Sequence, residues 1–130
     1  KYAADTAEKW RGDQLFSLRN DADLNTFWFS SWSGEKAAEE FVRAYQKVIE
    51  GRQRLRFDRV AQAKDLALIG MARDGRAWLL QARGPVVLVV ESATANRAIE
   101  LAEEAWRDLE IEAEATVVRF ESARRRVNFR

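Results

Sequence analysis

An unbroken run of five apolar residues, Val86 to Val90, constrains the fold more than any other stretch of this sequence. Gly84-Pro85 precedes the run and Glu91-Ser92 follows it, so it has the length of one strand. Because it lacks the alternation of a half-exposed strand, it predicts a strand buried on both faces in the middle of a sheet. A second apolar segment, Ala77 to Ala82, comes before the turn at Arg83-Gly84-Pro85 and predicts a neighbouring strand.

Two segments have the spacing of amphipathic helices. From Ala95 to Leu109, apolar side chains recur at steps of three and four residues, and charged side chains fill the remaining arc. Before it, a helix is expected with Ser33 as its cap and Gly51 as its end. The expected core stripe of this earlier helix is Ala38, Phe41, Val42, Tyr45, Val48 and Ile49.

Turn residues divide the rest of the chain into shorter elements. The predicted elements are a helix end at Lys1 to Trp10 stopped by Gly12, strands at Leu15 to Arg19, Thr26 to Trp32, Leu55 to Val60 and Leu66 to Ala72, and an edge strand at Ile111 to Phe120. Asn20-Asp21-Ala22-Asp23 and Asp74-Gly75 predict hairpin turns.

Short connections between most of these strands favour antiparallel pairing. We therefore expect an α+β domain, in which an antiparallel sheet of about six strands carries the two long helices on one face. The 130 residues, 47% of them hydrophobic, suffice for one core and thus for a single domain over 1–130. Because the chain begins at Lys1 without a methionine, we expect it to be a piece of a larger chain.

Composition excludes several chemistries. The chain has no cysteine and no histidine, which removes disulfides, thiolate sites, Ser-His-Asp triads and nearly every zinc site. No pair of carboxylates stands out as an acid and a base, so no catalytic residue, metal or cofactor is predicted. The net charge is +1, so nucleic acid is not an expected partner, and the longest apolar runs are too short to cross a bilayer.

Aromatic and short motifs leave a few candidate sites. Trp28 and Trp32 share one strand face and either fill the core or form the walls of a small-ligand groove. Arg11-Gly12-Asp13 spells a tripeptide that integrins recognise, but a glycine after a helix explains it equally well. Asp21, Asp23 and Asn25 have part of a calcium-loop spacing without its glycine and closing glutamate, and we interpret them as a turn.

Charge is unevenly distributed near the end of the chain. Seven carboxylates lie between Glu100 and Glu114, and five arginines follow from Arg119 onward. One interpretation is a solvated helix face followed by a basic tail; the other is a docking site on another protein or on the rest of the parent chain. The candidate docking residues are Arg124, Arg125, Arg126 and Arg130.

Two fragments, Glu8 to Gln14 and Trp32 to Phe41, resemble paired elements of poorly characterised exported bacterial and archaeal proteins. There, a Gly-Trp-Gly-Gly-Asp-Arg element precedes a strand, then Trp-Asp-Thr and an Ala-rich helix containing Glu-Phe. Those proteins tend to be lipoproteins or surface proteins, and some are similar to metallopeptidases. In this chain Lys9 and Arg11 replace two glycines, and Ser33 replaces the capping aspartate. The resemblance implies an extracytoplasmic location (periplasmic, surface or secreted) and an accessory role.

Two functional hypotheses follow. The first is a non-catalytic accessory or interaction domain of a larger exported protein. The second is a small-ligand-binding domain with a cleft between sheet and helices, lined by Trp28 and Trp32.

Overall fold

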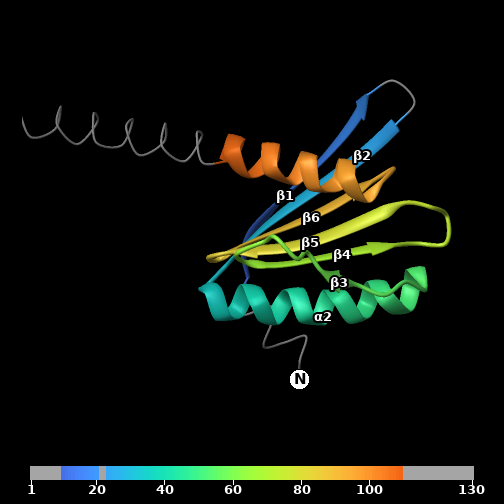
Figure 1. Ribbon diagram of the computed structural model, residues 1–130. Coiled ribbons are helices and arrows are strands. Elements are labelled where there is room, and N and C mark those ends of the chain that lie inside the picture. Colours follow the sequence, from blue (N-terminus) through green and yellow to red (C-terminus); the bar gives the residue numbers. More distant parts are fainter. Residues whose placement is uncertain (1–9, 21–22, 110–130) are drawn as a thin grey trace, which may run out of the picture.

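The computed structural model of the protein describes residues 10–20 and 23–109, which form an antiparallel sheet with a helix on each face (Figure 1). The elements are β1 (Trp10–Asn20), β2 (Asp23–Trp32), α2 (Glu35–Gln53), β3 (Asp58–Arg59), β4 (Leu66–Met71), β5 (Ala77–Arg83), β6 (Val86–Ser92) and a helix over residues 95–109. The sheet order is β1-β2-β6-β5-β4-β3. The α+β class and the antiparallel pairing are therefore as expected.

Strand β6 lies in the interior of the sheet, between β2 and β5. Phe29 of β2 pairs with Leu88, and Leu88 pairs with Gln81 of β5. Val87, Leu88, Val89 and Val90 are all buried. The prediction of a strand buried on both faces is confirmed.

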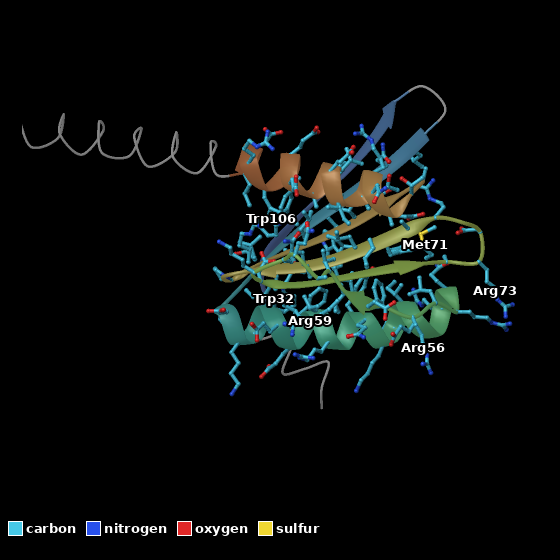
Figure 2. All side chains as sticks on the ribbon, in the orientation of Figure 1. Trp32, Arg56, Arg59, Met71, Arg73 and Trp106 are labelled. Atoms are coloured by element: carbon cyan, nitrogen blue, oxygen red, sulfur yellow. The ribbon has the colours of Figure 1, made fainter. Side chains whose placement is uncertain are left out.

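The two helices cover opposite faces of the sheet, so the prediction that both pack on one face is wrong. Val42 and Ile49 of α2 pack in one cluster with Leu80 and Val87, whereas Trp106 packs in a second cluster with Leu79. Figure 2 shows Trp32 on the α2 side and Trp106 beneath the other helix. In β5 and β6, successive side chains point to opposite faces of the sheet, and they are apolar on both faces. Each face must therefore be covered by a helix of its own.

Both predicted ends of α2 are wrong. Gly34, not Ser33, occupies the N-cap position, and it makes no side-chain capping bond. Gly51 lies inside the helix, which continues to Gln53 and ends with Arg54 in the left-handed conformation at φ 52° and ψ 47°. Of the predicted core stripe, Val48 is exposed, because it lies on the side of α2 that faces away from the sheet.

The segment predicted as a strand from Leu55 to Val60 contains only the two-residue β3, which pairs with β4. Leu55 and Phe57 instead turn inward and are buried in the α2-side cluster. They approach β4 closely at Gly70: a Cβ at that position would lie 2.8 Å from Leu55 Cδ1 and 2.9 Å from the Arg56 carbonyl oxygen. The chain can pass here because residue 70 has no side chain.

The β1-β2 and β4-β5 hairpins are confirmed, and Gly75 takes the positive φ of 87° that its turn requires. The prediction that Trp10 ends a helix and Gly12 stops it is wrong, because both residues lie in β1. Arg11-Gly12-Asp13 is thus part of a strand, beside an irregularity in the pairing between Trp10 and Gly12. Residues 1–9, Asp21, the segment 111–120 and Arg124 to Arg130 lie outside the described residues.

Candidate functional site

A groove of about 950 Å³ opens on the face of the sheet that the 95–109 helix covers. Its walls are the 60–65 segment and that helix, and strands β4 and β5 form its floor. We call it the 60–65 groove. Its lining residues are Val60, Ala61, Gln62, Ala63, Lys64, Asp65, Ala67, Leu79, Gln81, Arg83, Ile99, Ala102 and Glu103. The volume lies near the upper end of the roughly 300–1,000 Å³ that is usual for small-molecule sites.

A chain of polar contacts crosses the floor of this groove. The Trp106 indole Nε1 donates to Gln81 Oε1 at 2.9 Å, and Gln81 Nε2 donates to the Asp65 carboxylate oxygens at 3.0 and 3.1 Å. Arg83 Nε also donates to Asp65, at 2.9 Å. Each buried polar group thus has a partner, as burial requires. These hydrogen bonds connect the 60–65 segment, β5 and the 95–109 helix to one another.

Arg83 closes this chain of contacts into a ring. Its guanidinium carbon lies 4.8 Å from the centre of the Trp106 ring, close enough for a cation–π interaction. Its Nε donates to Asp65 and one flat face lies over Trp106, whereas its two Nη groups donate no hydrogen bond to any residue that the structure describes. Arg83 is therefore a positioned cation with donors left for a ligand.

Two further charges stand on opposite walls of the groove. Lys64 is exposed on the 60–65 segment, and Glu103 is exposed on the helix. Neither forms an ion pair within residues 24–109. Asp65, by contrast, is already paired with Arg83. The wall formed by the 60–65 segment is thus the more positive one.

Sequence reasoning missed Gln81 and Asp65. The signal for Gln81 was that it is the one side-chain amide in the otherwise apolar strand Ala77 to Ala82. Its neighbours Leu79 and Leu88 are core residues. A polar side chain buried there must find partners. The partners come from residues 16 positions earlier and 25 positions later, which no local pattern indicates.

Trp28 and Trp32 do not line the 60–65 groove; they lie on the other face of the sheet. The Trp32 ring is buried and stacks on Phe41 of α2, with ring centres 4.5 Å apart. Trp28 meets Phe41 and Tyr45 edge to face, at 5.5 Å in each case. The Trp32 indole Nε1 donates to Ser30 Oγ at 2.8 Å. These contacts fit the interpretation that the two tryptophans fill the core under α2.

A second polar group of residues lies on the α2 side, at the opposite end of β5. Arg76 Nε pairs with Glu91 Oε1 at 2.6 Å, and its Nη2 donates to the Leu24 carbonyl. Burial raises the pKa of the nearby Tyr45 hydroxyl above its ordinary value of 10.0, Arg52 opposes this rise, and Glu91 adds to it. Arg76 and Glu91 are thus already paired with each other, and Arg76 is also bonded to the backbone of β2.

Asn25, one of the three residues with calcium-loop spacing, is buried and accepts a hydrogen bond from Ser92 Oγ at 2.8 Å. Its side chain therefore serves as a link between β2 and β6. In the described part of the chain, no group of three or more acidic side chains is placed to hold a metal ion. Neither of the helices over residues 35–53 and 95–109 is long and apolar enough to cross a membrane.

Comparison with known proteins gives one match. Residues 1–124 match the family described as a domain of unknown function, DUF8575, and that description names no catalytic activity. No curated protein and no solved structure matches the chain. Because the match covers almost the whole sequence, the chain belongs to the DUF8575 family.

Proposed function

We propose that this chain is a non-catalytic accessory domain of an exported protein, and that it binds a small amphipathic carboxylate in the 60–65 groove. The observation that carries the proposal is the ring of contacts through Trp106, Gln81, Asp65 and Arg83, which holds one cation in place at the groove. A site whose polar groups are already oriented loses little entropy when the ligand binds.

The groove lining supports this class of ligand. Val60, Leu79 and Ile99 offer apolar surface for the body of the ligand. Lys64 and the Nη groups of Arg83, which make no hydrogen bond within residues 24–109, offer donors for its acid group, and a planar guanidinium matches a carboxylate well. Glu103 on the helix wall repels an anion, so the acid group would face the 60–65 wall.

A non-catalytic role is supported by the chemistry of the lining. Asp65 accepts hydrogen bonds from both Gln81 and Arg83, which leaves it poorly placed to take a proton from a substrate. The chain has no histidine or cysteine that could replace it. The exported location and the accessory role are supported by the resemblance of Glu8 to Gln14 and Trp32 to Phe41, and fractionation of cells that produce the intact protein tests them.

Calorimetric titration with matched compounds tests the groove. N-acetyl-leucine and octanoate should bind roughly tenfold or more tightly than N-acetyl-leucinamide and octanamide, because a charge-assisted hydrogen bond contributes about 1.5–3 kcal/mol. Ala63→Trp, which fills the groove from a half-exposed position, should abolish binding. Val48→Trp adds the same ring on the outer side of α2 and should leave binding unchanged. Equal binding of acid and amide, or full binding by Ala63→Trp, would contradict the proposal.

A further inference from the structure

One end of the molecule carries four exposed arginines. Arg52 lies in the last turn of α2, Arg54 and Arg56 follow it, and Arg73 lies in the β4-β5 turn. Among residues 24–109, no carboxylate forms an ion pair with any of the four. The backbone of Arg56 passes beside Gly70, three residues before Arg73, and Figure 2 shows Arg56 and Arg73 at the same end of the molecule. We call this surface the arginine end.

Exposed apolar side chains lie at this same end. The large hydrophobic residues exposed in the described chain are Leu24, Val48 and Met71, at 42%, 45% and 49%. Met71 lies two residues before Arg73, and Val48 lies one helical turn before Arg52. Leu24 is tied to the β4-β5 turn by the hydrogen bond from Arg76 to its carbonyl. Single exposed apolar residues are ordinary, but here Met71 and Val48 lie close in sequence to Arg73 and Arg52, and Leu24 is bonded to Arg76 in the same turn as Arg73.

We propose that the arginine end binds the surface of an anionic phospholipid bilayer. Guanidinium groups pair with phosphate in a two-pronged geometry, and each basic residue near such a surface strengthens binding about fivefold. Met71 and Leu24 would enter the boundary between headgroups and acyl chains, as apolar residues of peripheral proteins do. Arg83 and the 60–65 groove lie at the other end of β5, so a bound membrane leaves the groove open.

The exposed apolar residues favour a lipid surface over other anionic partners. A nucleic acid would use aromatic rings as stacking platforms. The nearest described rings are unsuitable, because Phe57 is buried and Tyr45 lies against Trp28 and Phe41. An acidic protein segment would satisfy the arginines but gives no role to Met71.

Co-sedimentation of the full chain with vesicles tests this proposal. Vesicles with equal amounts of phosphatidylcholine and phosphatidylglycerol should bind the protein, and phosphatidylcholine vesicles should not. The triple variant R54Q/R56Q/R73Q should lower binding about a hundredfold, because each lost arginine costs about fivefold. Met71→Ser should weaken vesicle binding but leave binding to soluble polyglutamate unchanged.

The matched control is R124Q/R125Q/R126Q, which removes the same charge from the basic tail. It should bind vesicles like the unchanged chain, and circular dichroism should show that both triple variants fold. The proposal is overturned if the unchanged chain binds duplex DNA or polyglutamate but no vesicles. It is equally overturned if the tail variant alone loses binding, or if both triple variants lose it to the same extent.

Discussion

The indole nitrogen of Trp106 donates a 2.9 Å hydrogen bond to the side-chain oxygen of Gln81, joining the 95–109 helix to the middle of the sheet. Both side chains are buried, at 4% and 8% exposure. Gln81 in turn donates a hydrogen bond to Asp65, so the Trp106–Gln81 pair connects the core of the domain to the wall of the 60–65 groove. Stability and binding are therefore expected to depend on the same pair of residues.

Trp106→Ala should destabilise the domain by about 3–5 kcal/mol, because it empties a large core site. It also leaves the Gln81 oxygen without its donor and removes the ring beneath Arg83. Denaturant unfolding followed by circular dichroism measures this change. A loss below about 1 kcal/mol would mean that the ring is not packed as described.

The Trp106–Gln81 pair should show energetic coupling in a double-mutant cycle. Trp106→Phe keeps most of the ring but removes the donor, and Gln81→Leu removes the acceptor at similar volume. Each single change leaves a buried polar group unpaired, at a cost of about 1–3 kcal/mol. The double variant should therefore be about 0.5–3 kcal/mol more stable than the sum of the two single changes predicts. Strict additivity of the unfolding free energies would contradict the hydrogen bond.

Two glycines should respond oppositely to alanine. Gly70→Ala places a Cβ 2.8 Å from Leu55 Cδ1 and 2.9 Å from the Arg56 carbonyl, so it should cost about 1–3 kcal/mol. Gly51→Ala meets no atom within 4 Å inside α2 and should stabilise by about 0.5–1 kcal/mol. Thermal melts should show a lower melting temperature for Gly70→Ala and a higher one for Gly51→Ala. A stabilising Gly70→Ala would show that the 55–57 segment does not approach β4 closely.

The strands predicted at Val86 to Val90 and around Asp74-Gly75 were found, whereas the prediction that both helices cover one face of the sheet was wrong. The Val86 to Val90 run and the Asp74-Gly75 turn define their strands by themselves, because burial and turn geometry act over a few residues. Helical periodicity shows which side of a helix is apolar, but not which sheet face it covers. Strand β5 indicates that both faces of the sheet need a cover, because Leu79 and Leu80 are both apolar and point to opposite faces.

The end of α2 and the site were missed for related reasons. Gly51 is exposed and takes an ordinary helical conformation, so its residue type alone does not end the helix. Asp65 reaches Gln81 only after β4 and β5 have paired in the register that places Ala67 opposite Gln81. The register between β4 and β5 is set by the packing of the core. In the sequence, only the amide of Gln81 within an apolar strand indicated that a polar partner would lie nearby.

Tyr45 should make stability depend on alkaline pH. Its pKa is higher in the folded chain than in the unfolded one, so the folded state favours the neutral phenol. Its contribution is fully present below the unfolded pKa of about 10 and is lost as the pH rises through the folded pKa. Urea unfolding from about pH 9 to about pH 12 should show a steeper loss of stability for the unchanged chain than for Tyr45→Phe. Identical pH profiles for the two proteins would contradict the burial of this hydroxyl.

Proton–nitrogen NMR tests most directly whether the 60–65 groove is the binding site. On titration with N-acetyl-leucine or octanoate, the Gln81 side-chain amide and the Trp106 indole signal should shift together, since one lines the groove and the other is bonded to it. The indole signals of Trp28 and Trp32, on the opposite face under α2, should stay in place. Shifts at Trp28 and Trp32 with Gln81 and Trp106 unmoved would contradict the account and move the site to the α2 side of the sheet.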